Sequence, residues 1–161
     1  SNELGSFDEW SEKKSLPWVL KTFPAHDSIS RLVRDLNLIY VHEKAMYLNE
    51  YNPNNFRWIM VDNADQSIFA FERFDGTTHL LFVFNMTPNF YENYDLGVIE
   101  KGNYHEIFNS DKDVYGGYNQ YNGLPLKAKK EPLNGKPYRI TIKIASFGAM
   151  IFKLKKYKKS K

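Results

Sequence analysis

The sequence contains no cysteine, which excludes disulfide frameworks and thiolate metal sites. Because a chain without cysteine is suited to a reducing compartment, we expect a cytoplasmic protein. The sequence also has no apolar run long enough to span a membrane, and its first residues do not follow the pattern of a signal peptide. We therefore expect no membrane partner.

The net positive charge of the sequence comes from its C-terminal end. The formal net charge of +3 at pH 7 becomes negative when the lysines from position 153 onward are left out. We expect residues 156–161 to form a solvated basic tail, because like charges in a short run repel one another. No nucleic-acid partner is expected, since the basic character does not extend over a face of the domain. The lysines concerned are Lys153, Lys155, Lys156, Lys158, Lys159 and Lys161.

The sequence is rich in apolar and aromatic residues, at 42% and 16%, which is enough for a folded core. Between positions 56 and 88, three runs of β-branched and aromatic residues predict consecutive antiparallel strands, with a tight turn at Asp75-Gly76. In the third run, Leu80 and Phe82 point to one face, and Leu81 and Val83 point to the other. A strand that is apolar on both faces is covered on both sides, so this sheet needs two covers.

Apart from these strands, the periodicities predict one helix and five further strands. The helix is expected at residues 27–41, capped by Asp27 and Ser28, with a short helical turn at 43–47. We predict a mostly β fold, a Greek-key β-sandwich of about eight strands preceded by a loop and one α-helix. The further strands are expected at about 94–99, 104–109, 124–131, 138–144 and 149–154, with a hairpin joining 124–131 to 138–144 across Asn134-Gly135.

No metal, cofactor or catalytic site is predicted. The run from Asp111 to Gly116 begins like a calcium loop, but Tyr115 and Asn122 stand where oxygen ligands are needed, so we expect a structural loop. The four histidines have no partner at helical spacing and no cysteine nearby. Carboxylate pairs such as Glu72 and Asp75 are interpreted as ordinary surface residues.

A glycine- and tyrosine-rich loop at 110–123 is the remaining candidate surface. Exposed tyrosines at the spacing of Tyr115, Tyr118 and Tyr121 can stack on the faces of sugars. The alternative, which we favour, is that these rings pack on the sheet or on a neighbouring domain.

Several stretches together resemble, in order and spacing, the C-terminal part of bacterial glycogen branching enzymes, which are 1,4-α-glucan branching enzymes of the α-amylase superfamily. The resemblance covers nearly the whole chain and ends at the lysine tail. The stretches include Asn2-Glu-Leu-Gly-Ser-Phe-Asp-Glu-Trp10, Ser15-Leu-Pro-Trp18, Phe23-Pro-Ala-His26, residues 32–40, Phe56-Arg-Trp-Ile59, Phe84-Asn-Met-Thr-Pro88, residues 94–98, Tyr104-His-Glu-Ile-Phe-Asn-Ser-Asp111 and Tyr115-Gly-Gly117.

The resemblance implies that residues 1–49 are the end of a catalytic (β/α)8 barrel, comprising a loop at 1–26, the helix and the helical turn. Residues 50–155 would be a β-sandwich of the α-amylase C-terminal domain type, and the barrel wall would be its second cover. The family's catalytic carboxylates lie on earlier barrel strands, so this chain holds none of them. Glu9 and Trp10 match a loop beside the active site and are expected near the glucan substrate.

The resemblance also implies what the chain does and what it binds. The parent enzyme would cleave α-1,4-glucan and transfer the chain to a 6-hydroxyl, forming the α-1,6 branches of glycogen without a cofactor. Two alternatives are a free-standing carbohydrate-binding module and the C-domain of another α-amylase superfamily enzyme. Without the barrel, we expect a sheet face to lose its cover, and the chain to self-associate through the N-terminal loop and the helix stripe with Leu32 and Leu36. That face is expected to carry Phe69, Phe71, Leu81 and Val83.

Overall fold

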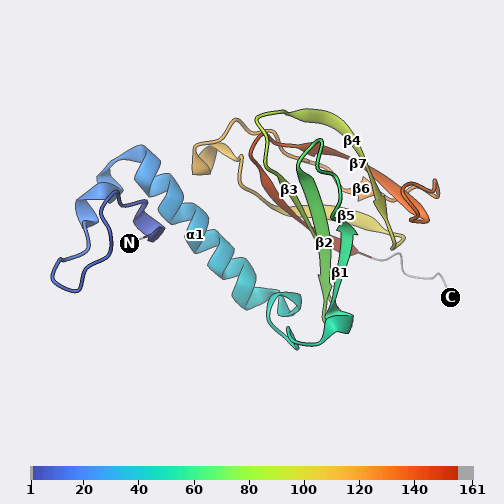
Figure 1. Ribbon diagram of the computed structural model, residues 1–161, viewed down its shortest axis with the longest axis horizontal. Coiled ribbons are helices and arrows are strands. Elements are labelled where there is room, and N and C mark those ends of the chain that lie inside the picture. The colour runs from blue at the N-terminus through green and yellow to red at the C-terminus, as the bar shows by residue number, and fades with distance from the viewer. Residues whose placement is uncertain (1, 156–161) are drawn as a thin grey trace.

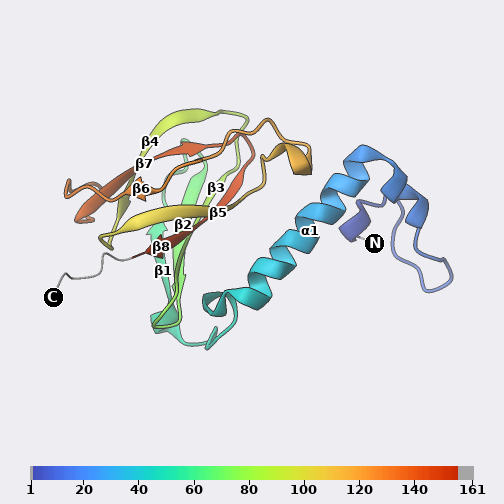
Figure 2. The same ribbon diagram turned by 180° about the vertical axis from the view of Figure 1, so that it is seen from behind.

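The computed structural model describes residues 2–155, and the predicted basic tail at 156–161 lies outside the described residues. Figure 1 shows a helical N-terminal segment running beside a β-sandwich, and Figure 2 shows the same arrangement from behind. The N-terminal segment contains the 3-10 turns η1 (Asn2–Leu4) and η2 (Trp18–Thr22), the helix α1 (Pro24–His42) and the turn η3 (Lys44–Met46). Within the described residues, no helix is long and apolar enough to cross a membrane.

The sandwich consists of one six-stranded sheet and one two-stranded sheet, with all strand pairs antiparallel. The order in the large sheet is β1-β2-β3-β8-β5-β6, and the small sheet is β4-β7. The last strand of the described residues, β8, therefore lies in the middle of the large sheet. The strands are β1 (Phe56–Met60), β2 (Ile68–Phe74), β3 (His79–Asn85), β4 (Tyr91–Val98), β5 (Asn103–Asn109), β6 (Leu126–Lys127), β7 (Tyr138–Ile144) and β8 (Ala149–Lys155), with 3-10 turns η4 (Pro53–Asn55) and η5 (Asp113–Tyr115).

The predicted eight-strand sandwich is confirmed, and so is the turn at Asp75-Gly76. Gly76 adopts a φ of +92°, a conformation that side chains with a Cβ rarely take. Oδ1 of Asp75 accepts hydrogen bonds from the backbone N–H groups of Thr77 and Thr78, at 2.7 and 2.6 Å. These contacts fix the register in which β2 and β3 pair.

The core between the two sheets is built from side chains that alternate along the strands. In β7, Ile140, Ile142 and Ile144 are buried, as the alternating pattern predicts. From the facing sheet, Leu81 and Val83 contribute fully buried side chains. The expectation that Leu81 and Val83 would lie on an uncovered face is therefore wrong, because the register of β3 turns them toward the small sheet.

The other face of the large sheet is covered in part by the chain's own helix. Leu80 and Phe82 of β3 form a second cluster with Phe108 and Ile151. Three side chains of α1 pack against this cluster, so the stripe with Leu32 and Leu36 is occupied rather than exposed. The helix residues are Leu32, Leu36 and Ile39.

The helix start and the segment at 124–131 differ from the prediction, and β4 begins three residues earlier than predicted, at Tyr91. The helix begins at Pro24, with Phe23 as its N-cap, because proline is favoured at the first helical position, where no N–H partner is needed. Asp27 is therefore inside the helix, where its carboxylate pairs with Arg31. The predicted turn at Asn134-Gly135 is present and is closed by a bridge between Leu133 and Lys136, and a bridge between Lys129 and Arg139 joins the preceding segment to β7. The strand expected at 124–131 is shorter, since β6 pairs with β5 over two residues only.

Candidate functional surfaces

The loop that carries Glu9 and Trp10 projects from the N-terminal end of the helix. Both residues are exposed, Trp10 to 74%, and they line a shallow cavity of about 290 Å3 formed by residues of the 6–17 loop. The loop is attached to α1 where Leu4 is buried and its carbonyl oxygen lies 2.7 Å from Nδ1 of His26. The structure thus places the two predicted residues side by side on a surface open to a partner or ligand.

The three predicted tyrosines of the 110–123 loop have different environments. The hydroxyl of Tyr115 donates a 2.8 Å hydrogen bond to Oδ2 of Asp35 on α1, and its ring lies 5.7 Å from that of Phe108. Burial and the neighbouring Asp35 carboxylate raise the pKa of Tyr115 to about 12. Hydrogen bonds from Arg34 and Tyr115 lower the pKa of Asp35 despite the cost of its burial. Tyr115 therefore joins the loop to the helix.

Tyr118 and Tyr121 are accessible to a ligand. Tyr118 is 86% exposed and Tyr121 is 41% exposed. The ammonium group of Lys112 lies 5.9 Å from the centre of the Tyr121 ring, which places a cation beside an aromatic face. Of the three rings proposed for sugar stacking, these two remain candidates, whereas Tyr115 is engaged by the protein.

The loop that presents these rings is held by the calcium-like stretch. Asp111 is buried, and its two carboxylate oxygens accept hydrogen bonds from the backbone N–H groups of Tyr118 and Gln120, at 3.1 and 2.9 Å. At Gly117 a Cβ would lie 2.2 Å from the carbonyl oxygen of Asp111, so only glycine fits there. Among residues 2–155, no group of three or more His, Asp or Glu is arranged to hold a metal ion. Asp111 stabilises the loop through these hydrogen bonds to its backbone.

Glu106 and Asn122 tie the end of this loop to both sheets. Oε2 of Glu106 on β5 accepts hydrogen bonds from the backbone N–H and the side-chain amide of Asn122, at 3.2 and 2.7 Å. Asn122 also bonds the backbone N–H and carbonyl of Lys143 on β7. Burial raises the pKa of Glu106 above the usual glutamate value, although the amide donors oppose that shift. The exposed rings are thus carried by an ordered scaffold.

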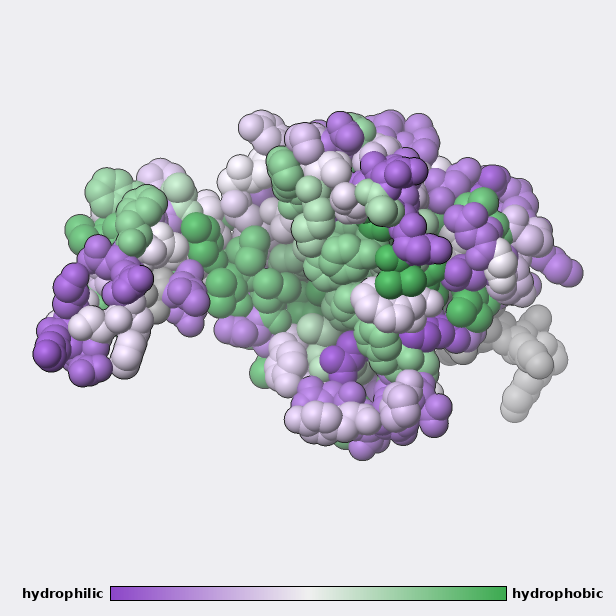
Figure 3. All heavy atoms as spheres, viewed as in Figure 1, coloured by the Kyte–Doolittle hydropathy of each residue, from purple (hydrophilic) through white to green (hydrophobic). Residues whose placement is uncertain are grey.

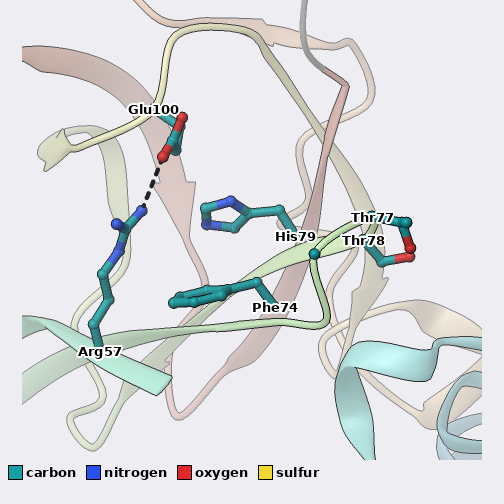
Figure 4. A pocket seen from close by; sticks show the side chains of 7 residues that line it. Arg57, Phe74, Thr77, Thr78, His79 and Glu100 are labelled. Atoms are coloured by element: carbon teal, nitrogen blue, oxygen red, sulfur yellow. Dashed lines mark ion pairs between the residues drawn. The ribbon is translucent and has the colours of Figure 1, made fainter. Parts of the chain in front are cut away.

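A pocket of about 210 Å3 lies at the turn between β2 and β3, where Figure 4 shows the side chains of Arg57, Phe74, His79 and Glu100 pointing toward one another. The guanidinium carbon of Arg57 is 5.3 Å from the centre of the Phe74 ring. Nη2 of Arg57 is 3.5 Å from Oε1 of Glu100. Thr77 and Thr78 complete the rim of the pocket.

Beneath this pocket lies Glu72, which is completely buried. Nε of Arg57 donates to its Oε2 atom, and Nε2 of His79 lies 3.0 Å from its Oε1 atom, although not in the geometry of a hydrogen bond. The interpretation of Glu72 as a surface residue is wrong. Because both carboxylate oxygens face Arg57 and His79, and the group has no exposure, it positions these two side chains and does not reach a ligand.

The comparisons with known proteins agree on the family. Residues 58–155 match the family model described as alpha amylase, C-terminal all-beta domain. The 1,4-α-glucan branching enzyme GlgB of Bacillus subtilis (strain 168) is 40% identical over 155 residues, which are 94% of this chain and 25% of that protein. GlgB of Gloeobacter violaceus is 37% identical over 150 residues, covering 92% of this chain and 20% of that protein.

Among solved structures, a crystal structure of an AmyP variant in complex with maltotriose is similar, with a TM-score of 0.57 and 12% identity. It covers 83% of this chain and 22% of that chain. At this identity the likeness concerns the fold alone. The chain spans between a fifth and a quarter of the length of these curated relatives, from 20% to 25%.

Proposed function

This chain belongs to the family of α-amylase C-terminal all-β domains, and on that premise we propose that it is the C-terminal part of a 1,4-α-glucan branching enzyme of glycogen biosynthesis. The observation that carries the proposal is the extent of the similarity to branching enzymes. The alignment with the Bacillus subtilis enzyme covers 155 residues, well beyond residues 58–155 of the all-β family model. It therefore takes in much of the helical N-terminal segment as well as the sandwich.

The proposed parent is a cytoplasmic glycosyltransferase that breaks an α-1,4 bond and passes the chain to a 6-hydroxyl. Retaining chemistry of this kind needs two carboxyl groups about 5–5.5 Å apart on either side of the scissile bond. Among the described residues, the carboxylate of Glu72 is completely buried against Arg57 and His79, so no surface of it is open to a substrate. In the proposal, the chain supports a catalytic barrel and does not perform the chemistry itself.

The exposed side chains support contact with α-glucan in the complete enzyme. Glu9 and Trp10 would lie near the substrate, since they share an open loop at the barrel end of the chain. Tyr118 and Tyr121 would offer rings to a glucan chain from the ordered loop described above. Tyr115 is not included, because its hydroxyl and ring are already in contact with α1 and β5.

We further propose that the barrel covers the outer face of α1, and that the isolated chain self-associates through this face and the N-terminal loop. No residue of α1 is fully buried. An apolar groove of about 430 Å3 runs along the helix, and in Figure 3 the hydrophobic colour gathers along α1 and on the neighbouring sheet face. Exposed apolar patches of several hundred Å2 are uncommon on monomers. The groove is lined by Glu3, Val33, Arg34, Asn37, Leu38 and Val41.

A chimera tests the proposed function directly. The corresponding quarter of the Bacillus subtilis branching enzyme is replaced by this chain, and branching of amylose is followed by the fall in iodine-stain absorbance. We expect the chimera to branch amylose, while the chain alone produces no change. A matched control chimera carries the sandwich region of AmyP, which shares the fold at only 12% identity and should not support activity. A folded but inactive chimera would overturn the proposal.

A further inference from the structure

Two asparagines of the sequence are followed by glycine, in the pairs Asn122-Gly123 and Asn134-Gly135. In such a pair the glycine nitrogen can attack the asparagine side chain, because glycine has no side chain that hinders the approach. We propose that Asn134-Gly135 is a site of spontaneous covalent modification in the folded protein, where asparagine is converted to isoaspartate and aspartate, and that the fold protects Asn122-Gly123. The proposal does not rest on the proposed function.

Asn134 and Gly135 form the exposed turn before β7, and their reacting groups are not held by the protein. Both residues take left-handed backbone conformations, with φ of 49° and 73°, as a two-residue hairpin turn requires. Two backbone hydrogen bonds of 3.0 Å between Leu133 and Lys136 close the turn. Within residues 2–155, neither the Asn134 side chain nor the N–H of Gly135 makes a hydrogen bond, so the amide can turn toward the nitrogen.

Asn122, by contrast, is held at both atoms of its side-chain amide. Its Nδ2 atom donates to Oε2 of Glu106 at 2.7 Å and to the carbonyl oxygen of Lys143 at 3.1 Å. Its Oδ1 atom accepts from the N–H of Lys143 at 2.8 Å. These contacts are partly buried, so water replaces them poorly when they break. Attack by the nitrogen of Gly123 requires the amide to leave this arrangement, and the pair is therefore protected.

The modification needs only water as a co-reactant. The backbone nitrogen of Gly135 forms a bond to Cγ of Asn134, and the side-chain nitrogen leaves as ammonia, which gives a five-membered succinimide ring. Water then adds to one of the two ring carbonyls and breaks its bond to nitrogen. Opening at the main-chain carbonyl gives isoaspartate, and opening at Cγ gives aspartate. The turn must open briefly for the first step, and local opening at an exposed turn has a low free-energy cost.

The position of the turn determines what the modification changes. In Figure 1 it lies at the end of the sandwich away from α1, so a cover over α1 leaves it open. Asn134 lines a cavity of about 510 Å3 together with Asp62 and Lys136, and modification places a new carboxylate there. The carbonyl oxygen of Leu133 would lie 2.4 Å from a Cβ at Gly97 of β4, so the turn packs closely on that strand. Isoaspartate lengthens the main chain at this contact and should destabilise the β4–β7 sheet.

Mass analysis of tryptic peptides from the 161-residue chain, aged in a mildly alkaline buffer, tests the proposal. Trypsin leaves peptide 131–139 intact across the bond between Lys136 and Pro137, and Asn134 is its only side-chain amide. Peptide 113–127 contains Asn122, and fragmentation assigns the change within it. We expect Asn134 to exchange ammonia for water at least about tenfold faster than Asn122, because freeing the Asn122 amide breaks several hydrogen bonds. Methylation by an isoaspartyl carboxyl methyltransferase should label the aged peptide 131–139.

The chain unfolded in urea is the matched control, since both pairs should then react at similar rates. Equal rates at Asn134 and Asn122 in the folded chain would overturn the proposal. So would a rate at Asn134 that is more than about tenfold lower in the folded than in the unfolded chain, because the turn would then be protective. The aged chain should also unfold at lower urea than the variant Asn134→Asp, which adds the charge without lengthening the main chain. Equal stability of the two would refute the expected effect on the β4–β7 sheet.

Discussion

Replacing Arg57 by methionine should destabilise the fold far more than the same change at Arg139. The two arginine side chains are equally exposed, at 29% and 30%, and each contacts two carboxylates. They differ in the burial of those partners. Glu72, beside Arg57, has no exposure, whereas Asp95 and Glu131, beside Arg139, are 43% and 50% exposed.

The magnitudes follow from this difference. Removing one member of a buried ion pair leaves an uncompensated charge and costs about 3–5 kcal/mol. We expect Arg57→Met to fall at the lower end, about 3 kcal/mol, because Arg57 is partly exposed and His79 remains beside Glu72. Exposed pairs contribute about 0–1 kcal/mol, so Arg139→Met should cost no more than about 1 kcal/mol.

Urea denaturation at pH 7, followed by circular dichroism and tryptophan fluorescence, measures both changes in the free energy of unfolding. Adding Glu72→Gln to the Arg57→Met variant should restore more than half of the loss, because it removes the unpaired buried charge. Equal costs for the two arginine variants would refute the reasoning, as would a double variant that is no more stable than Arg57→Met alone.

Three further predictions concern other contacts. Tyr115→Phe removes the hydrogen bond to Asp35 and should lower the free energy of unfolding by about 1 kcal/mol at pH 7. Because the folded pKa of Tyr115 is about 12 against 10.0 when free, this difference from wild type should persist up to about pH 10 and fade above it, as urea melts across pH would show. Because burial raises the folded pKa of Glu106 above its usual 4.5, the stability of the folded state falls as pH rises above 4.5. Glu106→Gln should flatten this decline between acid and neutral pH, and an unchanged pH profile would contradict the prediction. The double variant Leu38→Glu, Val41→Glu should convert the self-associated chain to a monomer in sedimentation experiments at micromolar concentration. Leu36→Glu should instead lower the free energy of unfolding, because Leu36 packs on the sheet. A wild-type chain that sediments as a monomer would contradict the proposed contact.

The strands and turns were predictable because their signals are local. Alternation in 138–144 and the Asp75-Gly76 turn specify β7 and the β2–β3 hairpin without reference to the rest of the chain. The start of α1 was predicted three residues late, since Asp27 and Ser28 are good caps and competed with the proline at the first helical position.

The features that could not be predicted depend on contacts between distant residues. Ile68, Ala70 and Glu72 alternate on one face of β2, which hints that Glu72 is buried, but its partners come from β1 and β3. Likewise, β3 is apolar on both faces, so its sequence does not reveal which face meets the small sheet. The pocket at the β2–β3 turn was missed for the same reason, because three separate segments form it.

The central position of β8 has a consequence for how the chain is made. The ribosome releases this strand after all the others, yet β3 and β5 both pair with it. Until β8 emerges, the nascent chain carries two incomplete half-sheets with unpaired edges. The surface on which α1 docks is also incomplete, because Ile151 of β8 is part of that surface. Such late, long-range closure is slow and leaves the growing chain prone to aggregation. A stop codon at the start of β8 would therefore prevent the whole sheet from closing, because this strand joins its two halves.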